Sequence, residues 1–241
     1  MSLVATLDSA LVRSTIDWWA LAGVDQLIDE EPVAWIKRGK PAPFLSQPVK
    51  PPPVLVPKTI EGLVAFLNSD ASLPQAGPPA RRIAASGDPA SDLMVVIDMP
   101  EIKDREAGHL ISGEAGVLFE KMLTALNLTR ATCYIAAICP GRPSGGVLPD
   151  SAMPRLAELA RDHIAMTGAT RLWLMGQTVS RAILGADFAK ARGSLQNFNH
   201  SGRNKVAIVS FSPRMLLQSP ERKKLAWKDM QMLLVGNETE I

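Results

Sequence analysis

The sequence predicts an α/β domain built on a doubly wound, mostly parallel sheet of four strands. Three observations lead to this prediction. Four short apolar runs have the length and composition of buried strands, segments with helical periodicity lie between them, and a proline-rich stretch separates this pattern from the N-terminal residues. A chain of 241 residues, 46% of them apolar, is long enough to bury the core that such a sheet requires.

The N-terminal residues show a pattern of their own. Residues 7–30 carry apolar side chains at helical spacing, among them Trp18, Trp19 and Leu21, which predicts an amphipathic helix. Tryptophan-rich helices of this kind often dock onto a partner protein. The alternative is that the helix folds back onto its own domain.

Seven prolines lie between residues 41 and 57, including three in succession. This density excludes a helix or a central strand, and it predicts an extended linker. We therefore expect three parts: a helical docking segment over 1–40, a linker over 41–58 and a folded domain over 59–241.

Within the folded domain, helices and strands are expected to alternate, starting with a short helix over 59–67. The runs that we expect to form strands are 93–98, 132–138, 171–175 and 205–211. The later helices are predicted over 113–126, 151–166, 177–184 and 220–235, the last with Ser219 as N-cap and Pro220 at its first position. This alternation implies right-handed crossovers between parallel strands.

Charge and composition limit the functions open to this chain. Its 26 basic and 24 acidic side chains give a formal net charge of +2, so we expect any contact with nucleic acid to be local and weak. The longest apolar runs are too short to span a membrane, and the N-terminus lacks the pattern of a signal peptide. These features predict a cytoplasmic protein that does not bind membranes.

The two cysteines, Cys133 and Cys139, lie in one apolar stretch, and the chain has no further pair. Two thiols do not complete a zinc or iron–sulfur site, and a disulfide framework needs more. We expect both to be small apolar core residues and expect no bound metal.

In a doubly wound sheet the functional site lies at the carboxyl ends of the strands. Segments of the loops at this edge occur in a recognisable order. Residues 108–116 read G-H-L-I-S-G-E-A-G, Arg142-Pro143 follow the second strand, and Phe211-Ser212-Pro213 follow the fourth. Together with Trp227 in the last helix, they resemble the uracil-DNA glycosylase superfamily over residues 59–235, most closely its family 4 iron–sulfur branch. The matching family patterns are G-x-P-F-x-G-x-A-G, C-R-P-P and H-P…W.

The resemblance implies a fold that flips a base out of DNA, clamps it with an aromatic ring and reads its edge. The family's stacking phenylalanine corresponds to Ile111, its uracil-reading asparagine to Ala137 and its histidine donor to Ser212. Ile111 has no aromatic face, Ala137 has no polar group, and the hydroxyl of Ser212 is short and uncharged. Loss of one preorganised donor commonly lowers a rate by about 100- to 1000-fold, so we expect little or no catalysis.

The family's first loop, G-E-A-P-G, corresponds to residues 97–101, which read I-D-M-P-E. Asp98 keeps a carboxylate and Pro100 is retained at the base-pocket position, but both glycines are replaced. Asp98 and Ser212 are thus the remnant catalytic candidates. Asp98 either positions water or accepts backbone N–H bonds in the next loop.

The resemblance also covers the cluster ligands of the family 4 enzymes. Their four cysteines correspond to Ser69, Ser72, Gly141 and Ala152. Because none of these residues has a thiol, we expect no iron–sulfur cluster and no other cofactor.

Nucleic-acid contacts are expected at Arg142, Arg214, Leu216 and Leu217. The two leucines correspond to the family's DNA-wedging loop; the alternative is that they pack beneath the final helix. Basic side chains at the start of that helix either contact phosphates or form a solvated face. The three histidines, His109, His163 and His200, are expected to be solvent-exposed and without a role.

A second resemblance appears where the chain departs from the enzymes. Residues 16–26, with Trp18 in an I-D-W-W-A-L run, are similar to the D-W-x-L…G-I-x-Q segment of the psi subunits of bacterial replicative clamp loaders. Residues 94–100 and Ser212-Pro213 also resemble psi. These subunits have a glycosylase-like fold without catalytic residues, and their N-terminal segment docks onto the clamp-loader collar.

Two functions follow from the sequence. The first is a non-catalytic accessory of DNA replication or repair that binds a clamp-loader or repair component, with weak DNA contact. The second is a divergent DNA glycosylase that uses Asp98 and Ser212 on uracil or another damaged base. A nucleotide-binding module is disfavoured because the glycine-rich phosphate fingerprints are missing.

Overall fold

The computed structural model describes residues 8–24 and 57–235, which belong to two compact units, 1–51 and 52–241. In the first unit, helix α1 (Ser9–Leu21) begins at Asp8, whose carboxylate accepts a hydrogen bond of 3.0 Å from the Ala10 N–H. Most of the segment that the sequence predicts to be a linker, 41–58, lies outside the described residues, as does the predicted helix beyond Val24.

The described part of the second unit is built on a five-stranded sheet with the strand order β2–β1–β3–β5–β4. Four strands are parallel, and the edge strand β4 pairs antiparallel with β5. The strands are β1 (Leu93–Ile97), β2 (Cys133–Ala137), β3 (Arg171–Met175), β4 (Leu195–His200) and β5 (Arg203–Ser210). The predicted mostly parallel α/β fold is confirmed.

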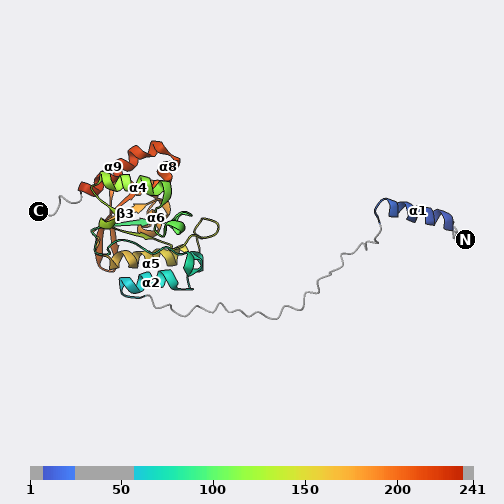
Figure 1. Ribbon diagram of the computed structural model, residues 1–241, viewed down its shortest axis with the longest axis horizontal. Helices are drawn as coiled ribbons and strands as arrows, with labels where there is room; N and C mark the ends of the chain where they lie inside the picture. The colour runs from blue at the N-terminus through green and yellow to red at the C-terminus, as the bar shows by residue number, and fades with distance from the viewer. Residues whose placement is uncertain (1–7, 25–56, 236–241) are drawn as a thin grey trace. The chain divides into compact units, whose positions relative to one another are not determined.

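Helices cover both faces of the sheet (Figure 1). One face packs against α4 (Gly113–Ala125), α8 (Pro213–Gln218) and α9 (Lys223–Val235). The other packs against α2 (Ile60–Ser69), α5 (Met153–Met166), α6 (Gln177–Leu184) and α7 (Phe188–Ala191). The central strands are buried on both faces, which explains their continuous apolar runs: Val95 and Trp173 face α4, whereas Val96 and Leu174 face α5.

The structure differs from the sequence prediction at the C-terminal side of the sheet. The edge strand β4 reads L-Q-N-F-N-H, and Phe198 is its one fully buried side chain, so no apolar run marked it as a strand. The last α-helix begins at Lys223 and not at Pro220: residues Pro220–Arg222 form a 3-10 turn, and the side chain of Ser219 makes no capping bond. The separate helix α8 lies before it and is capped by Ser212.

The prediction of three solvent-exposed histidines is wrong for two of them. His163 on α5 is 3% exposed, and its Nε2 lies 2.8 Å from the hydroxyl of Tyr134 on β2. Burial lowers the pKa of His163 to about 4. His200 is partly buried, with its Nε2 2.7 Å from a carboxylate oxygen of Asp162; His109 alone is exposed.

Both cysteines are free thiols in the core, as predicted. Cys133 packs on the α4 side of β2, and Cys139 packs on the α5 side just after this strand. Burial raises the pKa of both thiols above its ordinary value, so neither has the character of a reactive thiolate.

Candidate functional site

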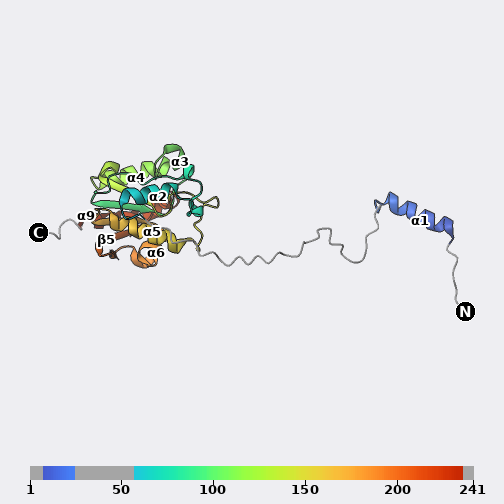
Figure 2. The same cartoon turned by 90° about the horizontal axis from the view of Figure 1, so that it is seen from below.

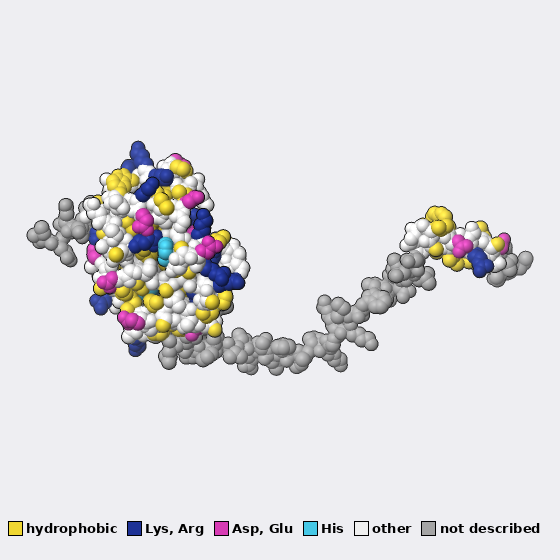
Figure 3. All heavy atoms as spheres, in the orientation of Figure 1, with side chains coloured by type: hydrophobic (Ala, Val, Ile, Leu, Met, Phe, Trp, Pro, Cys, Tyr) yellow, Lys and Arg dark blue, Asp and Glu magenta, His cyan; other side chains and the backbone are white. Residues whose placement is uncertain are grey.

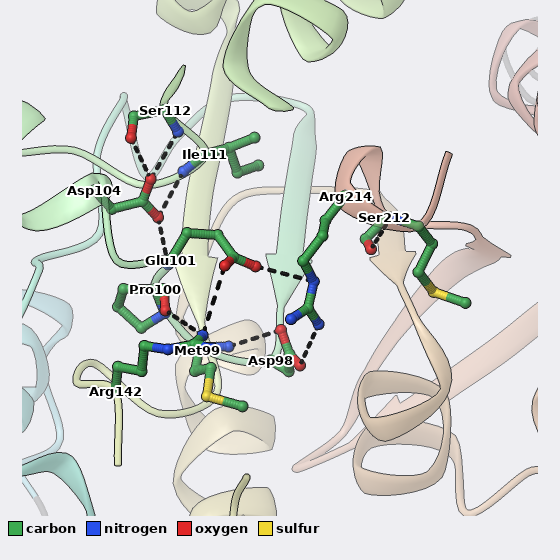
Figure 4. Close-up of polar contacts among 11 residues, drawn as sticks. Asp98, Met99, Pro100, Glu101, Asp104, Ile111, Ser112, Arg142, Ser212 and Arg214 are labelled. Carbon is green, nitrogen blue, oxygen red and sulfur yellow. Dashed lines mark hydrogen bonds and ion pairs between the residues drawn. The ribbon is translucent and has the colours of Figure 1, made fainter. Parts of the chain in front are cut away.

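The loops that follow β1 and β5 meet at the carboxyl edge of the sheet (Figure 4). The first loop runs from Asp98 through the short helix α3 (Asp104–Ala107) to Ser112 at the start of α4. The second contains Ser212 and leads directly into α8. These loops hold most of the positions that the sequence marked as candidates.

The carboxylate of Asp104 organises the first loop. It accepts hydrogen bonds from the backbone N–H groups of Glu101 (2.9 Å), Ile111 (3.1 Å) and Ser112 (2.7 Å) and from the Ser112 hydroxyl (2.6 Å). Asp104 has no exposed surface, so these four donors replace the water that a buried charge loses. The sequence analysis missed this residue because three of its four bonds are made to backbone groups, which leave no pattern in the sequence.

Ile111 has a backbone conformation that is rare for its residue type. Its φ angle is 56°, and a left-handed conformation costs a non-glycine residue about 1–2 kcal/mol. Asp104 fixes its N–H, while the Arg130 guanidinium donates to the carbonyls of Ile111 and, at 2.8 Å, Leu110. The next helix approaches closely because Gly116 has no side chain; a Cβ atom there would lie 2.6 Å from the Ile111 carbonyl oxygen.

Glu101 binds two arginines across the mouth of this site. Its carboxylate lies 3.0 Å from Nε of Arg214 on α8 and 3.6 Å from Nη1 of Arg142 (Figure 4). Arg142 also donates to the carbonyl of Pro100 at 3.1 Å, and Arg214 lies 3.8 Å from the Asp98 carboxylate. The two arginines among the side chains predicted to contact nucleic acid are therefore both engaged by acidic or carbonyl groups of the first loop.

The space between these loops is very small. Asp98, Ile111, Ser212 and Arg214 line a void of about 20 Å³, which is room for about one water molecule. Asp98 accepts a hydrogen bond of 2.9 Å from the Met99 N–H. Ser212 accepts one of 3.4 Å from the Met215 N–H as the cap of α8.

The remaining candidates lie apart from this void. Ala137 ends β2 and lines a different, smaller void of about 10 Å³ beside His163 and α2. Leu216 is 2% exposed and packs in the core with residues of α9, whereas Leu217 is 39% exposed. The alternative that the leucines pack beneath the final helix thus describes Leu216, and Leu217 is the one open to solvent.

The residues present at the cluster positions do not fit an iron–sulfur group. Serine, glycine and alanine side chains supply no thiolate, and such clusters are held by cysteine. At Gly141 a Cβ atom would lie 1.8 Å from the carbonyl oxygen of Ala76, so a cysteine does not fit there without movement of the backbone. Within residues 8–24 and 57–235, no group of three or more His, Cys, Asp or Glu side chains is placed to hold a metal ion.

Comparison with family models identifies the domain. Residues 84–231 match the model of the uracil DNA glycosylase superfamily, over more than half of the chain. The chain belongs to this superfamily. The match begins just before β1 and ends within α9, so it includes all five strands and both loops of the site.

This uracil-DNA glycosylase-like chain matches the superfamily over the loops of the site, and at most of the positions that the resemblance names it holds other side chains. Asp98, Ile111 and Ser212 come together around one void, as the resemblance implies, whereas Ala137 does not join them. Pro100 lies in the same loop and contributes its carbonyl to Arg142. The kinship with the family 4 branch and with psi stays a prediction.

Helix α1 carries the partner-docking candidates. Trp18, Trp19 and Leu21 are 65%, 47% and 89% exposed, and hydrophobic side chains are visible on the surface of this helix (Figure 3). None of the helices in the described ranges has the length and apolar character needed to cross a membrane.

Proposed function

We propose that this uracil-DNA glycosylase-like protein excises no base and acts as an accessory of DNA replication or repair through protein binding, with at most weak DNA contact. The observation that carries the proposal is the ion pair between Glu101 and Arg214. Both side chains of this pair line the narrow space between Asp98, Ile111 and Ser212, where the resemblance places a flipped base. With about 20 Å³ left between Asp98, Ile111 and Ser212, the site takes a water molecule but not a pyrimidine ring.

The chemistry of the lining residues supports the same conclusion. Ile111 offers no ring for stacking, and Ala137 offers neither donor nor acceptor for the edge of a base. The hydroxyl of Ser212 caps helix α8, and Asp98 faces the Arg214 guanidinium at 3.8 Å. Both groups that the resemblance marks as catalytic thus have other protein partners in this arrangement.

The proposed weakness of DNA contact follows from the pairing of the arginines. Lysine and arginine side chains that bind phosphates release counterions from the nucleic acid, and this release provides much of the binding free energy. Arg142 and Arg214 both face the carboxylate of Glu101. Arg214 also faces the carboxylate of Asp98. DNA would have to displace these carboxylates first.

The partner-binding part of the proposal is supported by the side chains of α1. At 100° per residue, Leu11, Val12, Ile16, Trp18 and Trp19 share one side of the helix, while Arg13 and Asp17 lie opposite. All of these apolar side chains are exposed, from 38% for Val12 to 65% for Leu11 and Trp18. Large aromatic side chains are the usual anchors of protein interfaces, and the partner we propose is a clamp-loader or repair component.

Excision is tested with the purified protein in excess over single-stranded DNA that contains uracil, followed by alkali to break abasic sites. We expect no strand breaks above those of a protein-free sample. Breaks that appear with the intact protein and disappear with Asp98→Ala would refute the non-catalytic proposal.

Partner binding is tested by co-purification with the clamp-loader and repair proteins of the same organism. The double variant Trp18→Ala/Trp19→Ala should lose a partner that the control Arg13→Ala/Asp17→Ala retains, because only the first changes the apolar face. Equal recovery of every partner by both variants would contradict docking through α1.

A divergent glycosylase remains the second candidate function. The observation in its favour is that Asp98 and Ser212, the two remnant candidates, line the same void. In that case the Glu101–Arg214 pair would have to open when DNA binds, and the excision assay decides between the two functions.

A further inference from the structure

A groove lies between α5 and α6 at the carboxyl edge of the sheet, and it shares Asp98, Met99 and Arg214 with the candidate site. The two helices lie side by side (Figure 2). The groove has a volume of about 620 Å³, within the size range of ligand-binding pockets in proteins. Met153 and Ala157 of α5 and Ala182 of α6 form part of its walls, and Met99 and Leu148 lie at the sheet edge.

The charged side chains that line this groove include more arginines than carboxylates. Arg161, Arg181 and Arg214 line it, opposed by the carboxylates of Asp98 and Asp150. Asp98 faces Arg214 at 3.8 Å, so the other two arginines face one acidic group. The guanidinium group of Arg161 donates to the carbonyls of Ala182 and Ile183, which hold it in place. Arg181 has no ion-pair partner in the described part of the chain.

The first turn of α6 adds to this positive potential. Its N-cap is Gly176, whose φ of 107° is an angle that glycine adopts readily. Glycine has no side chain that could cap the helix. The next two residues, Gln177 and Thr178, line the groove. Uncapped N–H groups at a helix start favour a negative charge nearby, and here they lie at the same groove as Arg181.

We propose that this groove binds an acidic peptide segment of a protein partner. Carboxylates of the peptide pair with Arg161 and Arg181 and with the first turn of α6. An apolar side chain of the peptide packs against Met99, Leu148 and Met153. This goes beyond the proposed function, because it rests neither on α1 nor on the closure of the base pocket.

The groove favours a peptide over a nucleic-acid strand for two reasons. Asp98 and Asp150 repel a continuous phosphodiester backbone, whereas a peptide places its charges only where arginines lie. The residues that line the groove include no aromatic ring, and single-stranded nucleic acid is usually held by stacking on such rings. The apolar wall, in contrast, fits a leucine or phenylalanine side chain.

The probe is a fluorescein-labelled octapeptide pool with Asp, Glu, Leu or Phe at each position, measured by fluorescence anisotropy with the full-length protein. We expect saturable binding that weakens by about tenfold or more with Arg181→Glu, since reversal of a contact charge turns attraction into repulsion. The matched control is Arg203→Glu, an exposed arginine on β5 outside the groove, which should change affinity by less than about twofold. A pool with serine in place of Leu and Phe should bind at least about tenfold more weakly, because it cannot use the apolar wall.

Three results would overturn the proposal. The first is the absence of saturable binding with the mixed pool. The second is an equal effect of Arg181→Glu and Arg203→Glu, which would mean that overall charge alone attracts the peptides. The third is a labelled oligothymidine that binds more tightly than the peptides and loses its affinity in Arg181→Glu, which would assign the groove to nucleic acid.

Discussion

Glu101 stands where the resemblance implies a glycine, and its carboxylate faces two arginines of the site. Its carboxylate lies 3.0 Å from Arg214 and 3.6 Å from Arg142, two arginines that lie far from it in the sequence. A glycine there would leave both guanidinium groups without this partner. This one side chain thus holds two cations that come from separate loops.

Replacement of Glu101 by alanine should therefore strengthen DNA binding. We expect the affinity for single-stranded DNA to rise about three- to tenfold at low salt, with a steeper salt dependence, because released arginines add phosphate contacts. The measurement is an anisotropy titration at several salt concentrations. Glu106→Ala removes the same charge from the exposed part of α3 and serves as control; if it matches Glu101→Ala, net charge and not arginine release explains the gain.

Asp104 is the residue on which the loop geometry depends most. Replacement by alanine leaves the N–H groups of Glu101, Ile111 and Ser112 without their acceptor and removes the force that holds Ile111 at positive φ. We expect the free energy of unfolding to fall by about 3–5 kcal/mol, as for other broken buried charge networks. Urea denaturation monitors the change. Asp104→Asn, which keeps an acceptor oxygen, should lose less, and a loss below about 1 kcal/mol in Asp104→Ala would contradict this role.

At the level of elements, α5 docks onto β2 through one buried polar contact, between His163 and Tyr134. Burial keeps the imidazole neutral by lowering its pKa from 6.5 to about 4, and it raises the pKa of Tyr134 to about 12. The unfolded chain binds a proton at this histidine below pH 6.5, whereas the folded protein does so only near pH 4. Stability is thus complete above pH 6.5 and decreases as the pH falls toward 4.

This contact should be visible in the pH dependence of unfolding. Between pH 7 and pH 5 we expect His163 to account for a loss of about 2 kcal/mol in the free energy of unfolding. Urea denaturation of His163→Gln should show a profile flatter by this amount, even if the variant is less stable at pH 7. His109→Gln, a change at the exposed histidine, should keep the wild-type slope. Identical slopes for wild type and His163→Gln would refute the assignment.

Burial separates the strands that the sequence predicted from the strand that it missed. The four parallel strands are largely buried on both faces, so each contains an apolar run that can be found in the sequence. β4 lies at an edge, buries Phe198 alone and is stabilised by its pairing with β5, which no local pattern reports. His163 was mistaken for a surface residue because helical spacing does not show which polar side chain finds a partner.

The candidate site was predictable in outline for a similar reason. The strand order places the carboxyl ends of β1, β3 and β5 together, and the family resemblance names the positions there. The contacts that close the site join Glu101 to Arg142 and Arg214 across separate loops. Pairing over such separations depends on the folded geometry, and a sequence without aligned relatives contains no sign of it.

For the whole molecule, the fold and the proposed partner binding should be separable. The buried core of the described unit draws on residues from Leu63 to Leu233, none of them from 1–51. We expect a chain of residues 52–241 to unfold in urea with a free energy within about 0.5 kcal/mol of the full-length value, and to lose the partners that depend on Trp18 and Trp19. A loss of stability above about 1 kcal/mol would instead show that the N-terminal helix folds back onto its own domain. Full partner recovery by the shortened chain would place docking elsewhere, and the groove between α5 and α6 would then be the first surface to test.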